Sequence, residues 1–84
     1  MKIITLTKGY STKVSDEDHV WLSAWKWNVM ENREKELSPR PRAWRYENGR
    51  PIYMSREILK APKGLWIDHI NGDTLDNRKD NLRL

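Results

Sequence analysis

The chain has no cysteine and no phenylalanine among its 84 residues. The lack of cysteine excludes disulfide bonds and thiolate metal sites, and it suits a reducing compartment. No apolar run is long enough to cross a membrane, and the apolar start at Ile3 and Ile4 is interrupted too soon for a signal peptide. We therefore expect an intracellular, cytoplasmic protein that does not enter a membrane.

The aromatic residues are five tryptophans and three tyrosines. A chain of this length buries only about 60 to 65% of its unfolded surface, so a few large rings must build the core. We expect one compact unit, in which residues 1–49 form a β-rich region with one short helix. Residues 50–84 form the second region, which carries the candidate site.

Local patterns predict an α+β fold of small antiparallel hairpins and short helices. β-Branched residues predict a first hairpin over residues 2–14, and a capping pattern at Ser15 and Asp18 predicts a helix to about Ala24. The period-two pattern of Trp25, Trp27 and Val29 predicts a strand. A loop is expected over residues 31–41 because this stretch is charged and contains two prolines.

A second hairpin is predicted over residues 44–54, with its turn at Asn48-Gly49. Pro51 cannot donate a backbone hydrogen bond, so the returning strand should lie at a sheet edge. A helix is expected from an N-cap at Ser55 to about Ala61, before Pro62 and Gly64.

Residues 68–84 place a carboxylate, an imidazole and several carboxamides around Asn71-Gly72. That pair accepts the positive φ angles of a type I′ turn, so residues 73–75 should pair antiparallel with residues 65–69. A helix is expected from near Asp76, which would place Asn77 and Asn81 one turn apart on one face. We expect Asp68, His69 and Asn81 to meet in one pocket, where they could supply metal ligands and a base.

The ligand types in this segment restrict the metal. A calcium loop with Gly72 at its sixth position needs acidic residues where Ile67 and Arg78 stand. With no cysteine and only His19 and His69, a structural zinc site within one chain is excluded. A hard divalent cation remains, most readily Mg²⁺ with Mn²⁺ as the alternative, because such an ion keeps waters and takes phosphate ligands.

The spacing of these residues resembles the HNH endonuclease family, in particular the phage and intron homing type with a ββα-metal active site. The resemblance is carried by residues 68–73, 75–78 and 81–83. It implies His69 as general base and Asp68 as metal ligand. It further implies Asn77 as the middle asparagine that braces the loop and Asn81 as the second metal ligand, with asparagine in place of the third motif histidine.

The function implied is hydrolysis of DNA phosphodiesters in a phage or its bacterial host. The metal would neutralise charge on the leaving oxygen, and the imidazole would take a proton from the attacking water. A single chain would nick one strand, whereas a homodimer could cut both.

Composition agrees with double-stranded DNA as the partner, since sixteen Lys and Arg against twelve Asp and Glu leave a net charge of +4. Several arginines alternate with aromatic residues in the middle of the chain. Such a ribbon can follow phosphates, although a solvated sheet face with arginine stems over rings is an alternative. The predicted DNA contacts are Arg40, Arg42, Arg45, Arg56, Arg78 and Arg83.

Two other functions fit the same sequence. Ser55-Arg56 stands where the family commonly has His-Arg, so one alternative is a DNA-binding module on an HNH scaffold with weak or no catalysis. The other is a domain that only binds proteins, which would show no salt-sensitive association with DNA.

Overall fold

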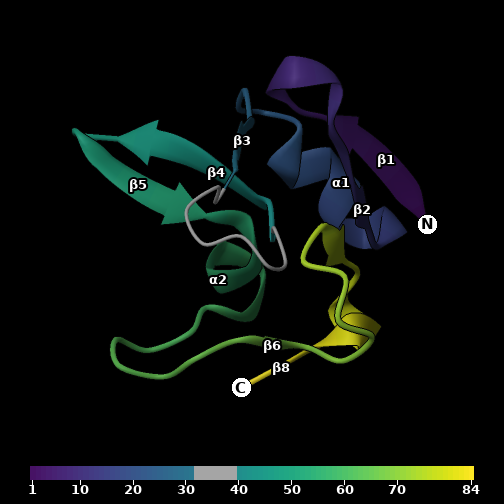
Figure 1. Ribbon diagram of the computed structural model, residues 1–84, viewed down its shortest axis with the longest axis vertical. Helices are drawn as coiled ribbons and strands as arrows, with labels where there is room; N and C mark the ends of the chain where they lie inside the picture. The colour runs from purple at the N-terminus through teal and green to yellow at the C-terminus, as the bar shows by residue number, and fades with distance from the viewer. Residues whose placement is uncertain (32–39) are drawn as a thin grey trace.

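A computed structural model describes residues 1–31 and 40–84 of the chain. The fold is a small α+β arrangement of short strands and two short helices, as the sequence predicts (Figure 1). No helix within the described residues is long and apolar enough to cross a bilayer.

The first hairpin is confirmed. β1 (Lys2–Thr5) pairs antiparallel with β2 (Ser11–Val14), and the short 3-10 turn η1 (Thr7–Gly9) joins them. The helix α1 (Asp16–Leu22) follows with Ser15 at its N-cap position, as predicted, and ends two residues before the expected Ala24. The Ser15 hydroxyl does not cap this helix but accepts a hydrogen bond from the Lys79 N–H at 2.9 Å. It thereby ties α1 to the C-terminal segment.

A second antiparallel sheet has the strand order β3-β4-β5, made of β3 (Asn28–Met30), β4 (Arg42–Glu47) and β5 (Arg50–Tyr53). The predicted turn at Asn48-Gly49 is confirmed, and the φ angles of 51° and 78° at these two residues show that it is of the primed type. Pro51 lies on the edge strand β5, where its missing N–H costs no ladder bond.

The strand predicted from Trp25 begins only at Asn28. Trp27 and Val29 are buried as expected, but Trp25 remains 43% exposed. The predicted loop over residues 31–41 falls mostly outside the described residues.

The helix α2 (Met54–Leu59) starts two residues earlier than predicted, with Tyr53 rather than Ser55 at its N-cap. The reason is that β5 runs directly into the helix, which allows Met54 to be fully buried in the core. The helix ends at Leu59, two residues before the expected Ala61, because its C-cap Lys60 adopts the left-handed conformation.

The segment after α2 differs most from the sequence prediction. β6 (Asp68–His69) pairs antiparallel with β8 (Leu82–Arg83), not with residues 73–75. The turn is closed by the Gly72 N–H, which donates to the His69 carbonyl at 2.8 Å. Gly72 has a positive φ but Asn71 does not, so the predicted type I′ turn at Asn71-Gly72 is wrong.

The helix predicted from Asp76 is also wrong. The chain there forms β7 (Asp76–Asn77), which pairs in parallel with β2, and then a single 3-10 turn η2 (Lys79–Asn81). Tertiary contacts override the local helix signal. The Asp76 carboxylate accepts hydrogen bonds from side chains instead of capping a helix. Of the predicted ββα unit, residues 68–84 therefore contain paired strands without an α-helix.

One apolar core joins all these elements. Its buried members come from both helices and all three sheets, so residues before and after position 50 share it. They are Ile4, Val14, Leu22, Trp27, Ala43, Met54, Ile58 and Leu82. The Trp27 indole satisfies its N–H by donating to the Leu22 carbonyl at 2.8 Å.

Candidate functional site

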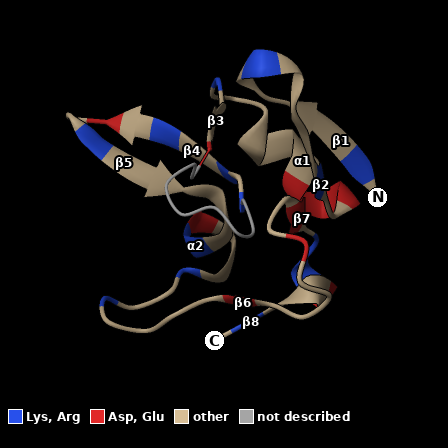
Figure 2. Ribbon diagram, viewed as in Figure 1, with Lys and Arg blue, Asp and Glu red and all other residues tan. Residues whose placement is uncertain are grey.

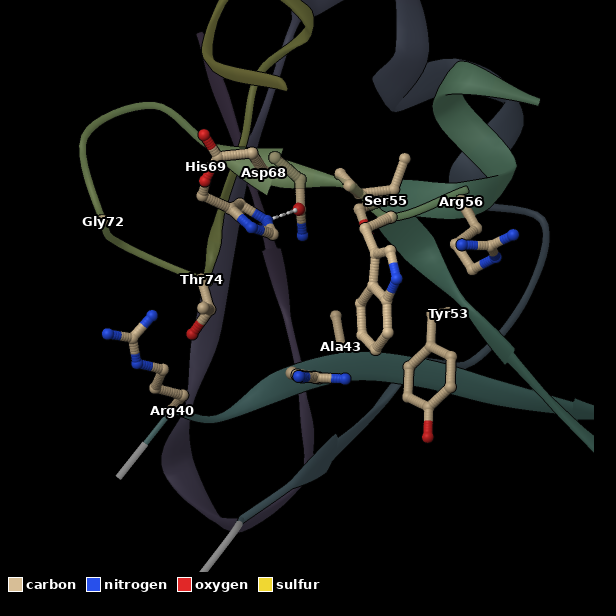
Figure 3. A pocket seen from close by; sticks show the side chains of 13 residues that line it. Arg40, Ala43, Tyr53, Ser55, Arg56, Asp68, His69, Gly72 and Thr74 are labelled. Carbon is tan, nitrogen blue, oxygen red and sulfur yellow. Dashed lines mark hydrogen bonds between the residues drawn. The ribbon is translucent and has the colours of Figure 1, made fainter. Parts of the chain in front are cut away.

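A cavity of about 350 Å³ opens beside β6 (Figure 3). Asp68 and His69 lie along it, with Arg40 and Thr74 toward one end and Tyr53 and Arg56 toward the other. The remaining lining residues are Arg42, Ala43, Ser55, Trp66, Ile67, Gly72 and Asn77. The cavity therefore combines a carboxylate, an imidazole, a carboxamide and three guanidinium groups.

His69 is held by the buried side chain of Asn77. Its Nε2 lies 2.9 Å from the Asn77 Oδ1, and the dashed line at His69 in Figure 3 marks this contact. Asn77 is only 1% exposed, and its position is fixed because β7 is paired with β2. The imidazole is therefore held at the cavity by a rigidly placed side chain.

A hydrogen-bond chain decides which nitrogen of His69 carries the proton. Thr12 donates its hydroxyl hydrogen to the Leu75 carbonyl at 2.7 Å, so its oxygen can only accept from the Asn77 Nδ2 at 3.0 Å. The Asn77 Oδ1 must then face His69, and it accepts from Nε2–H. In the neutral tautomer that this contact selects, Nδ1 carries the lone pair that a general base needs.

Asp68 lies next to His69 at the exposed start of the site. Arg83 stands opposite it in the β6–β8 ladder and contacts its Oδ2 through Nε at 2.9 Å and through a terminal nitrogen at 2.8 Å. Both side chains remain more than half exposed, so solvent weakens this ion pair. Asp68 is therefore accessible from the cavity while Arg83 offsets its charge.

Asn81 does not line this cavity. It is 6% exposed, and its Nδ2 donates to the Asn71 Oδ1 at 3.0 Å and to the Asp76 carbonyl at 2.9 Å. Its Oδ1 accepts from the Asn71 N–H at 3.1 Å. The predicted convergence of Asp68, His69 and Asn81 is therefore wrong for Asn81, because its carboxamide is turned into the loop. The bracing contacts that the resemblance implied for Asn77 are made by Asn81.

Asp76 is a buried charge that sequence reasoning missed. Arg78 donates to both of its carboxylate oxygens at 2.7 Å, and the Asn71 Nδ2 donates at 2.9 Å. The Arg78 hydrogen bonds, followed by that of Asn71, lower the pKa of Asp76 to about 2. Arg78 was predicted to contact DNA, but its guanidinium is committed to this carboxylate. The signal that could have revealed the pair is the Asp-x-Arg spacing within a polar loop.

Of the other predicted DNA-contacting arginines, Arg83 pairs with Asp68, and the remaining four separate into two groups. Arg40, Arg42 and Arg56 line the cavity. Arg45 is 5% exposed and contacts Glu47 at 2.9 Å and Glu57 at 2.7 Å, with its guanidinium 4.1 Å from the Trp25 ring centroid. The predicted DNA contact of Arg45 is therefore wrong, because the side chain is enclosed by its own ion pairs and aromatic neighbours.

The acidic residues of α1 do not line the cavity. Basic residues mark β4 and β5 (Figure 2). Because the lining contains three arginines and one aspartate, the cavity suits an anionic ligand.

Within the described residues, no three acidic or histidine side chains gather closely enough to form a metal cage. Asp68 is the one carboxylate in the cavity lining. This donor set does not fit a cation held by protein ligands alone. It fits a hard divalent ion that keeps most of its waters and shares a substrate phosphate, as Mg²⁺ does.

The HNH endonuclease family model matches residues 60–84, which contain β6, β7 and β8. This match supports assignment to the HNH endonuclease family and confirms the resemblance seen in the motif. An HNH domain implies nuclease chemistry, and nucleases of this family act on DNA. The match spans less than a third of the 84 residues. Neither a curated protein nor a solved structure gave a significant match.

Proposed function

We propose that the protein is a metal-dependent DNA endonuclease of the homing type, which hydrolyses a phosphodiester bond in the cavity beside β6. The observation that carries this proposal is the orientation of His69. Asn77, whose carboxamide is oriented by Thr12, accepts from the His69 Nε2–H, so the Nδ1 lone pair is kept free for a water molecule.

The chain's own residues divide the work between binding and proton transfer. Arg40 and Arg42 offer cationic groups in the cavity to a phosphate. His69 accepts the proton of the attacking water at Nδ1, while Asn77 keeps the ring from rotating. Such a positioned base contributes on the order of 10²- to 10⁴-fold in rate.

Asp68 is the residue that would hold the divalent ion, Mg²⁺ or alternatively Mn²⁺. When bound, the ion supplies neutralisation of the charge that develops on the phosphate and leaving oxygens. We assign Asn81 to bracing the loop rather than to the metal, since three hydrogen bonds already occupy its carboxamide. The β6–β8 pair would then be the strand part of a ββα-metal motif.

A nicking assay on supercoiled plasmid with Mg²⁺ or Mn²⁺ tests the proposal. His69→Ala should lower the rate of nicking by about 100-fold or more, because the base is lost while the arginines remain. His19→Ala is the matched control, since His19 lies on α1 outside the cavity lining. Equal rates for His69→Ala and the parent would refute the assignment of the base.

One observation favours a second function, a DNA-binding module without useful catalysis. The site has a single carboxylate, and Arg83 neutralises it. If the parent chain binds DNA in a salt-dependent manner but leaves the plasmid supercoiled with either metal, this second function replaces the first.

A further inference from the structure

Trp66 is the most exposed aromatic side chain among the described residues, with 84% of its surface accessible. Its neighbour Leu65 is 48% exposed. By contrast, Trp27 is buried, and Trp25 packs edge to face against Trp21 and Trp27. Soluble proteins rarely leave adjacent large apolar side chains in water without a use for them.

The segment that carries Trp66 is fixed by its backbone. Arg56 donates from its two terminal nitrogens to the Leu65 carbonyl at 2.7 Å and to the Pro62 carbonyl at 2.9 Å. The Leu65 N–H closes the turn by donating to the Pro62 carbonyl at 3.2 Å. These charge-assisted bonds hold the turn although Leu65 and Trp66 stay largely in water, so the backbone that carries the indole is held in place beside the cavity.

Trp66 shares the cavity with His69, Tyr53 and Arg42. The Arg42 guanidinium lies 5.8 Å from the centroid of the Tyr53 ring. Aromatic rings beside arginines are the combination that binds single-stranded nucleic acid, because rings stack on bases while guanidinium groups meet phosphates. A space of about 350 Å³ is the size of a small-ligand site and has room for a single nucleotide rather than a duplex.

We propose that Trp66 stacks on an unpaired nucleobase, so that the cavity receives a DNA nucleotide displaced from its helix next to the bond that is cleaved. The face of a base is accessible to an indole only when the base has left its neighbours in the stack. The proposal rests on the proposed function for the position of the cleaved bond. It makes the preferred substrate a duplex with a bulge, mismatch or open junction.

The test measures binding of the full chain to two labelled DNAs by fluorescence anisotropy. One is an intact duplex, and the other has the same sequence with a one-nucleotide bulge. The His69→Ala variant is used as the parent here so that neither DNA is cut. We expect it to bind the bulged DNA about tenfold more tightly than the intact duplex, because base stacking on an aromatic ring supplies an effect of this size.

Adding Trp66→Ala should abolish the preference for the bulge and leave affinity for the intact duplex unchanged, while Trp66→Phe should retain part of it. Tyr46→Ala is the matched control, since Tyr46 is also exposed, at 66%, but lies outside the cavity lining. A parent without preference, or a preference that survives Trp66→Ala, overturns the proposal. So does an equal loss for both DNAs, which would indicate a general contact with duplex.

The nicking assay separates this proposal from the nuclease function. A protein that prefers the bulge but never nicks would retain the stacking site and lose the nuclease assignment. A protein that nicks plasmid but binds both DNAs equally would keep the nuclease assignment and lose the stacking site.

Discussion

Two adjacent segments of this protein differ in whether they bury polar side chains or expose apolar ones. Residues 70–81 bury Asp76, Asn77 and Asn81, all of them polar. Residues 60–67 leave Leu65 and Trp66 exposed to water. The first loop uses polar groups as its internal framework, and the second uses a hydrogen-bonded backbone to present apolar groups. The comparison therefore predicts that substitutions in the first loop cost stability, whereas those in the second cost binding.

The largest effect on stability is expected for Asn81→Ala. The substitution removes three hydrogen bonds and leaves the Asp76 carbonyl without its buried carboxamide donor. We expect a loss of about 3 kcal/mol in the free energy of unfolding, since unsatisfied buried groups cost about 1 to 3 kcal/mol each. Urea denaturation followed by tryptophan fluorescence measures it. Asp80→Ala, one residue earlier and exposed, should change stability by less than about 0.5 kcal/mol. Equal stabilities of the two variants would contradict the bracing role.

A smaller effect, which depends on pH, is expected for Asp76→Asn. The folded-state pKa of about 2 lies below the ordinary 3.8, so the ionised carboxylate stabilises the fold above about pH 5. That contribution is lost as the pH falls toward 2. The variant should be less stable than the parent by about 2 kcal/mol at pH 7.

Urea midpoints at pH 7 and pH 3 test the sign of this effect. The difference between Asp76→Asn and the parent should shrink at the lower pH, because the Asp76 carboxyl takes up a proton in the unfolded parent at pH 3 while it stays mostly ionised in the folded one. A difference that grows on acidification would mean that Arg78 does not stabilise the charged form.

The smallest effect on stability is expected for Arg56→Lys. This substitution tests the loop of residues 60–67, which Arg56 holds by its hydrogen bonds. Lysine keeps the charge but cannot reach the Leu65 and Pro62 carbonyls as a planar fork. We expect a loss below about 1 kcal/mol. The amide of Leu65 should nevertheless exchange its hydrogen faster, as measured by NMR. Arg50→Lys on β5 provides the control, and unchanged exchange in Arg56→Lys would show that the turn does not depend on the fork.

Elements with local causes could be predicted from sequence. The Asn48-Gly49 hairpin and the helix after Ser15 follow from backbone preferences and from patterns a few residues long. The strand at Asp76 could not be predicted in this way. Its extended form depends on pairing with β2, more than sixty residues earlier, and local capping signals favoured a helix instead.

The candidate site was likewise predictable where its causes are local and not where they depend on distant residues. The motif predicted that Asp68 and His69 lie together, and they line one cavity. Which asparagine faces His69 was not predictable, because that depends on Thr12 accepting from Asn77. The burial of Arg45 had a signal in the sequence, since it shares a strand face with Ala43, which lies in the core.

The parallel pairing of β7 with β2 has a consequence for how the molecule folds. The Thr12 to Asn77 contact spans 65 positions, so the ends of the chain must find each other before the imidazole is oriented. A peptide containing only residues 60–84 would carry the family motif without the threonine that sets its tautomer. In the proposed nuclease, the orientation of the general base would therefore depend on a contact between distant parts of the chain.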